Sequence, residues 1–81
     1  MNEDEARALA ANHADTHLAD LEPTSWRVTA FDGGWYLVPQ GDHLRWRTGV
    51  IGLVVTDDGA VHEESTSQPP SIVIDRYRRA P

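Results

Sequence analysis

Four short stretches of this chain have the apolar patterning of β-strands. Residues 25–31 (SWRVTAF) alternate, with Trp26, Val28 and Ala30 on one side, and residues 60–64 alternate Val61 with His62. Residues 35–39 begin with an apolar run that indicates a central strand or one partly covered on both sides. Pro39 has no backbone N–H to donate and is expected to end this strand. Residues 50–56 are largely β-branched, and Gly52 within them indicates a bulge or a close backbone approach.

Two Gly-containing turns connect these stretches in pairs. Asp32-Gly33-Gly34 separates the first two, and Asp57-Asp58-Gly59 separates the last two. In such turns acidic side chains accept local backbone amides, and Gly supplies the positive φ. The pattern therefore predicts two hairpins that together form a four-stranded antiparallel sheet.

A helix is expected before the sheet, over residues 3–21. Asn2 can cap it, Glu5 completes a variant of the capping box, and the acidic first turn suits the helix dipole. Small and apolar residues recur every three or four positions, and Pro23 stops the pattern. We expect this helix to lie flat across one face of the sheet.

The C-terminal stretch 71–79 is ambiguous. Ile72-Val73-Ile74 favours a fifth strand, whereas the helical spacing of apolar residues from Pro70 to Tyr77 favours a short helix. We favour the helix. The predicted fold is thus a single α+β domain over residues 1–81, with an N-terminal helix packed on a four-stranded antiparallel sheet and a short C-terminal helix.

Charge and composition narrow the classes of partner that the chain is expected to bind. The chain has 81 residues, a formal net charge of −6 and no Cys. Residues 1–70 hold twelve acidic residues and four Arg, a net charge of −8, which disfavours binding to nucleic acid or anionic lipid and would attract a basic protein. The alternative is that the negative charge only keeps the protein soluble. Lacking Cys, a long apolar run and a basic leader, the chain is expected to be cytoplasmic, with no membrane contact.

Catalytic and metal-binding patterns are weak. His13 and His17 have the helical spacing of zinc ligands, but Ala14 replaces the Glu of zinc hydrolases and no third ligand is fixed nearby. Asp57 and Asp58 with Glu63 and Glu64 are better explained as turn and edge-strand charges than as an acid–base pair. We therefore predict no enzyme activity, no metal and no cofactor.

Trp46 differs from the other tryptophans. Trp26 and Trp35 lie in predicted strands and are expected to contribute to the core, whereas Trp46 lies in a polar connection between Arg45 and Arg47. An exposed aromatic residue beside Arg is typical of interface anchors. The alternative is that Trp46 covers the sheet.

Five short motifs follow one another along the chain: Trp26-Arg27-Val28, residues 31–38 (FDGGWYLV), Gly49 with residues 53–55 (LVV), residues 58–62 (DGAVH), and Pro69-Pro70 through Tyr77. Their order resembles the YrhB-type family, small bacterial proteins grouped with the immunity proteins of toxin systems. The resemblance implies the same helix–sheet–helix fold and a toxin as partner. The chain departs from the family pattern at Val50-Ile51-Gly52, where the family has N-x-P, and at Thr56, where the family has Asp.

The charge pattern predicts a binding protein without catalytic activity, and the resemblance to YrhB-type proteins implies an immunity protein that neutralises a toxin by stoichiometric protein–protein contact. The alternative is a homodimeric structural or regulatory module that pairs through its sheet edge, and monomer and homodimer both stay open; a small enzyme is a third, weaker reading. In an immunity protein of this kind, acidic residues would steer a basic partner and an aromatic residue would anchor that partner. The expected partner-binding residues are Asp32, Trp46, Asp57, Asp58, Glu63 and Glu64.

Overall fold

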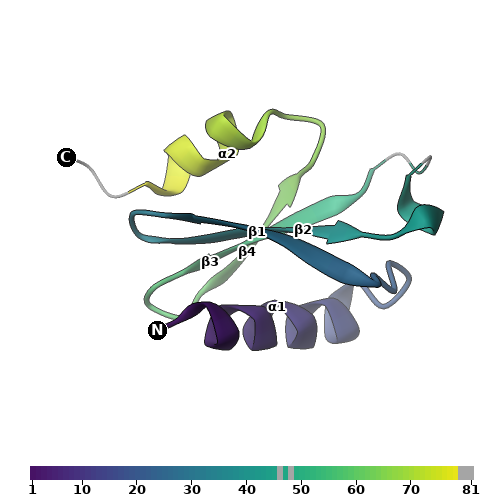
Figure 1. Cartoon of the computed structure of the whole chain (residues 1–81), viewed down its shortest axis with the longest axis horizontal. Coiled ribbons are helices and arrows are strands. Elements are labelled where there is room, and N and C mark those ends of the chain that lie inside the picture. The colour runs from purple at the N-terminus through teal and green to yellow at the C-terminus, as the bar shows by residue number, and fades with distance from the viewer. Residues whose placement is uncertain (46, 48, 79–81) are drawn as a thin grey trace.

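The fold is a four-stranded antiparallel sheet between two helices, which confirms the predicted α+β class. The computed structural model describes residues 1–45, 47 and 49–78. The strands lie in the order β1-β2-β3-β4, with α1 on one face of the sheet and α2 on the other (Figure 1). The elements are α1 (Glu3–His17), β1 (Ser25–Phe31), β2 (Gly34–Gln40), the 3-10 helix η1 (Asp42–Leu44), β3 (Ile51–Thr56), β4 (Val61–Ser65) and α2 (Pro70–Tyr77).

Helix α1 begins where the capping pattern predicts and ends four residues early. The Asn2 side chain accepts the backbone N–H of Glu5 at 2.9 Å, whereas the last helical residue is His17 rather than residue 21. A turn closed by the Leu21 N–H on the Leu18 carbonyl, at 3.0 Å, follows the helix. The chain leaves the helix there because Leu21 is buried in a separate apolar cluster with Leu44 and Val50.

The sheet has an apolar core on each of its faces. On the α1 side, Leu37, Leu53 and Val55 pack against the small residues Ala6 and Ala10, and all five are fully buried. Trp26 and Trp35 pack against the margin of this cluster and are partly exposed. The second cluster, on the α2 side, consists of Tyr36, Val54, Val73 and Ile74.

Strand β2 is central and covered on both faces, as its apolar run predicts. The strand continues through Pro39, which we expected to end it, and Pro39 pairs opposite Trp26 of β1. Along β2, alternate residues turn their backbone groups to β1 or to β3, and Pro39 belongs to the set that faces β3. Pairing with β3 stops at Leu37 and Leu53, so the missing N–H costs no ladder hydrogen bond.

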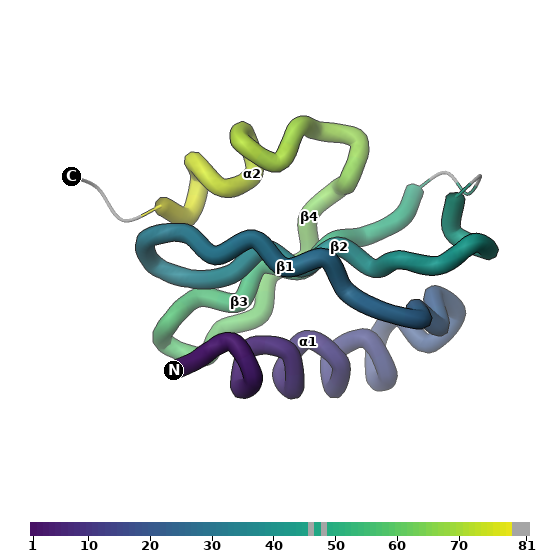
Figure 2. The backbone as a smooth tube through the Cα atoms, viewed as in Figure 1, coloured from purple at the N-terminus to yellow at the C-terminus, as the bar shows by residue number. Residues whose placement is uncertain are grey.

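Within the C-terminal stretch, Pro70–Tyr77 form a helix and not a fifth strand. Pro70 is its first residue, a position where no intrahelical N–H bond is lost. Val73 and Ile74 point into the second core, which explains why a β-branched run folds as a helix here. Figure 2 shows the chain crossing from the end of β4 over the sheet to place α2 on the face opposite α1.

Candidate functional site

The two hairpin turns lie side by side at one end of the sheet. The backbone N–H of Asp57 in the β3–β4 turn donates to the carbonyl of Gly33 in the β1–β2 turn at 3.0 Å. This bond brings Asp32, Asp57 and Asp58 to the same end, and all three are exposed. The start of α1 lies at this end as well (Figure 1). Three of the acidic residues expected from the sequence therefore form one group.

Asp58 also shapes the turn in which it lies. Its Oδ1 accepts the hydroxyl of Thr56 and, at 3.1 Å, the backbone N–H of Ala60. The Thr56 hydrogen bond first, and the Ala60 amide second, hold the pKa of the Asp58 carboxyl below its usual value. The carboxylate therefore stays charged at neutral pH while it fixes the turn.

Two further acidic residues, Glu3 and Asp4, begin α1 at the same end. Met1 lies beside the β3–β4 turn: a Cβ built on Gly59 of this turn would be 3.7 Å from Cε of Met1. Glu3 is in an ion pair with Arg7 at 3.1 Å. We name the exposed group Glu3, Asp4, Asp32, Asp57 and Asp58 the acidic end.

Sequence reasoning assigned the charges of the first helical turn to the helix dipole and missed this placement. A signal for it exists in the sequence. The short connection from α1 to β1 makes the helix run back along the strand, so its N-terminus must lie near the far end of β1, where the β1–β2 turn is.

Glu63 and Glu64 are not part of the acidic end. Neighbouring residues of a strand point to opposite faces, and here Glu63 faces α1 while Glu64 faces α2. The Glu63 carboxylate contacts Nε2 of His13 at 2.9 Å. Both side chains therefore hold helices to the sheet.

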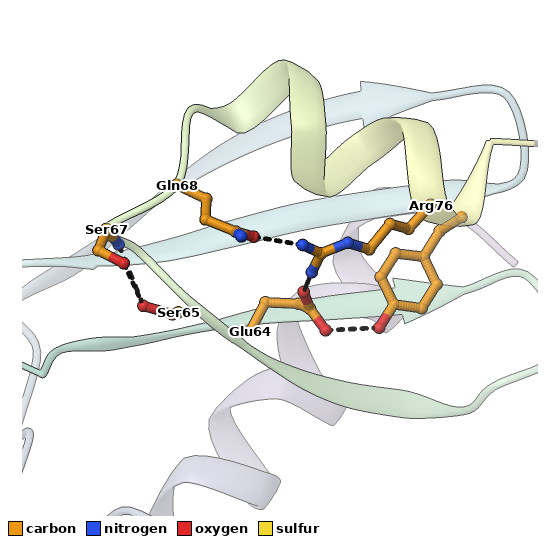
Figure 3. Close-up of polar contacts among 6 residues, drawn as sticks. Glu64, Ser65, Ser67, Gln68 and Arg76 are labelled. Carbon is orange, nitrogen blue, oxygen red and sulfur yellow. Dashed lines mark hydrogen bonds and ion pairs between the residues drawn. The ribbon is translucent and has the colours of Figure 1, made fainter.

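The contacts of Glu64 hold α2 in place. Its carboxylate is in an ion pair with Arg76, whose guanidinium also donates to the Gln68 side chain at 2.5 Å (Figure 3). The Tyr77 hydroxyl donates to the same carboxylate at 2.7 Å. Burial first, and then this hydrogen bond to Glu64, raise the pKa of Tyr77 to about 12. Glu64 thus links the end of the sheet's edge strand to the last turn of α2.

Polar contacts at the opposite end of the sheet join two loops. Arg47 is in an ion pair with Asp20 and also donates to its backbone carbonyl at 3.1 Å, and the hydrogen bond and charge of Arg47 lower the pKa of Asp20. Nε2 of His43 lies 2.6 Å from the Leu21 carbonyl oxygen. An open depression of about 880 Å³ lies beside these loops. It is lined by residues 24, 38–45, 47, 50 and 66.

Trp46, the expected interface anchor, lies outside the described residues. Its role as an anchor or as a cover over the sheet therefore stays a prediction.

The two histidines of α1 contact each other, and one of them also contacts the sheet. The rings of His13 and His17 lie 4.7 Å apart between centroids, and His13 reaches Glu63 across the helix–sheet interface. Among residues 1–45, 47 and 49–78, no group of three His, Cys, Asp or Glu side chains is placed to hold a metal ion. No helix within the same residues is long and apolar enough to cross a membrane.

Comparison with known proteins found no relative: the chain matches no protein-family model, no curated protein and no solved structure.

Proposed function

We propose that this protein is an immunity-type binding protein that neutralises a basic protein toxin by stoichiometric contact, with the acidic end as the surface that meets the toxin first. The observation that carries the proposal is the hydrogen bond between Asp57 and Gly33, which fixes two acidic turns side by side. The resemblance to YrhB-type proteins supports the choice of a toxin as the partner.

The arrangement at the acidic end suits electrostatic steering. Its carboxylates come from three separate segments of the chain and are exposed, so their fields add in front of the same end of the molecule. Steering of this kind raises the association rate with an oppositely charged partner and weakens as salt is added, because the screening length is about 8 Å at physiological ionic strength.

The binding step itself would be occlusion, which needs no catalytic group in this chain. Trp46 is proposed as the anchor that keeps the complex together. Truncation of a buried aromatic anchor mainly raises the dissociation rate, whereas loss of a rim charge mainly lowers the association rate. Trp46→Ala and a charge reversal at the acidic end should therefore act on different rate constants.

The test compares two variants of equal net charge. Asp32→Lys with Asp57→Lys reverses two charges at the acidic end, and Asp15→Lys with Asp42→Lys reverses two exposed acidic residues elsewhere. Surface plasmon resonance against the protein recovered by affinity capture from the native cell gives both rates. We expect the first variant to lower the association rate about tenfold and the second to have a much smaller effect.

Equal effects of the two variants would show that only total charge matters and would remove the acidic end as the contact surface. A native cell that yields no heterologous partner would favour the alternative, a homodimeric structural or regulatory module. Asp58 is left unchanged in both variants because its side chain also holds the turn.

A further inference from the structure

Strand β1 is an open edge of the sheet with little protection against pairing. The edges are β1 and β4, and β4 is a short strand that carries Glu63 and Glu64. By contrast, β1 has seven residues, no Pro and, among its side chains, Arg27 as its only charge. Charges, Pro and short length are the usual means by which proteins block edge strands. The β1 edge lacks most of them.

Neither helix packs chiefly on this edge. Helix α1 lies against β2, β3 and β4, and α2 lies against β2. In the views of Figures 1 and 2, β1 runs in front of the other strands, with α1 below it and α2 above it. A strand added beside β1 would therefore meet neither helix first.

The backbone groups that point outward from β1 can be assigned. The Thr24 N–H donates to the Gln40 carbonyl at 2.8 Å, so this carbonyl faces β1. Alternation along the ladder then turns the backbone groups of Ser25, Arg27, Thr29 and Phe31 toward β2. The amide and carbonyl groups of the remaining strand residues, Trp26, Val28 and Ala30, face the open edge, and no strand within the described part of the chain pairs with them.

We propose that the β1 edge pairs antiparallel with β1 of a second copy of this chain, about a two-fold axis at Val28, to give a continuous eight-stranded sheet. In this register Val28 pairs with the partner's Val28, and Trp26 pairs with the partner's Ala30. Each such pair exchanges two backbone hydrogen bonds, about six in all. A two-fold axis requires the edge to be complementary to itself. The sequence of β1 meets this requirement.

Side chains on both faces fit this register. On the α1 face, the large indole of Trp26 lies opposite the small, exposed Ala30 of the partner. On the α2 face, Arg27 lies opposite the partner's Thr29, which brings no like charges together. Moving the axis to Arg27 would place two guanidinium groups opposite each other, which is unfavourable. Moving it to Thr29 would place Trp26 opposite the partner's Asp32, beyond the end of the strand.

The test uses charge at position 29, which is exposed and lies on the α2 face. Sedimentation equilibrium over a range of about 1 µM to 1 mM should show wild type passing from its monomer mass of 9.0 kDa to twice that value. Thr29→Arg places a second positive charge opposite the partner's Arg27, and Thr29→Glu places a negative one there. We expect the first to weaken and the second to strengthen dimerisation, each about fivefold, since the contact occurs twice.

Two further variants complete the test. Exchanging the charges, Arg27→Glu together with Thr29→Arg, should restore the dimer that Thr29→Arg weakens. Val28→Pro removes the central outward N–H without removing a bond to β2, and should leave a folded monomer as judged by circular dichroism. The Asp32→Lys, Asp57→Lys variant should dimerise like wild type, which separates this contact from the acidic end.

A wild-type chain that stays at 9.0 kDa across the whole concentration range would overturn the proposal. So would a dimer whose affinity is the same in Thr29→Arg and Thr29→Glu, because that dimer would use another surface. If Val28→Pro fails to fold, the opposite effects of the two Thr29 variants still decide the question.

Discussion

The ring of Tyr36 on β2 lies against the bare α-carbon of Gly52 on β3. A Cβ built on Gly52 would lie 2.8 Å from Cε1 of Tyr36 and 3.0 Å from its hydroxyl oxygen. The register of β3 with β4 continues unbroken through Gly52, so the residue makes no bulge. The absence of a side chain here is what lets a large aromatic residue be buried under α2, where it is 2% exposed.

Gly52→Ala should therefore destabilise the protein, although Ala normally suits a strand better than Gly does. We expect a loss of about 1–3 kcal/mol in the free energy of unfolding, as for overpacking of a core. Urea denaturation measures it. The control is a double-mutant cycle: in a Tyr36→Leu background the same substitution should cost clearly less, and an unchanged cost would place the strain elsewhere.

Asp58 should make stability depend on acidic pH. Its pKa in the folded protein lies below the unfolded value of 3.8, so the charged form stabilises the fold above that pH and the contribution disappears as pH falls through the folded pKa. Asp58→Asn should thus lower the melting temperature at pH 7 and match wild type more closely near pH 3.

Thr56→Val is the control for this effect, because it removes the hydroxyl that is the main cause of the shift. In a Thr56→Val background, the chain with Asp58 and the chain with Asp58→Asn should differ less in how their melting temperatures depend on pH. If the melting temperatures of wild type and Asp58→Asn differed by the same amount at every pH, the lowered pKa of Asp58 would be contradicted.

Tyr77 should resist ionisation in alkaline solution. With a pKa of about 12, roughly 1% of its hydroxyl groups are ionised at pH 10, where half of a free tyrosine would be. A folded-state pKa above the unfolded value means that the stabilising contribution is complete below pH 10 and is lost as pH rises toward 12. The near-ultraviolet absorbance of tyrosinate follows the titration.

The pKa of Tyr36 is also raised, by burial first and by the charge of Glu64 second, so the two tyrosines must be separated. Tyr77→Phe leaves only the Tyr36 signal and removes the hydrogen bond to Glu64, at a cost of about 1–2 kcal/mol. A tyrosinate signal that develops near pH 10 in folded wild type and is lost in Tyr77→Phe would contradict the burial of Tyr77 and its hydrogen bond to Glu64.

Zinc is expected to leave the protein unchanged. His13 is already in contact with Glu63, and the ring of His17 lies tilted beside that of His13. Micromolar zinc should therefore not raise the melting temperature, because only a ligand that binds the folded state stabilises it. A rise that is lost in His17→Ala would establish a metal site on α1.

Local signals predicted most of the fold. The capping residues place the start of α1, and the two Gly turns with the alternation around them place all four strands to within a residue. The end of α1 was not predictable in this way, because it depends on burial of Leu21 with Leu44 and Val50, which are distant in the sequence. The continuation of β2 through Pro39 depends likewise on how far β3 extends beside it.

The candidate site was only partly predictable for a similar reason. The turn sequences identify Asp32, Asp57 and Asp58, but the bond that joins the two turns links residues 24 positions apart. The separation of Glu63 from Glu64 follows from strand alternation alone. Their partners, His13 and Arg76, depend on which face each helix covers, and no local pattern specifies that.

The strand order β1-β2-β3-β4 also bears on how the protein folds. Every pair of neighbouring strands is consecutive in the sequence, so the sheet can grow one strand at a time, and the entropy cost of closing a loop rises only slowly with its length, even for the connection over residues 41–50 between β2 and β3. Docking of α1 onto β4 is different, since the His13–Glu63 contact spans 50 residues. Substitutions in the β2–β3 ladder should therefore slow folding, whereas loss of the His13–Glu63 contact should chiefly accelerate unfolding.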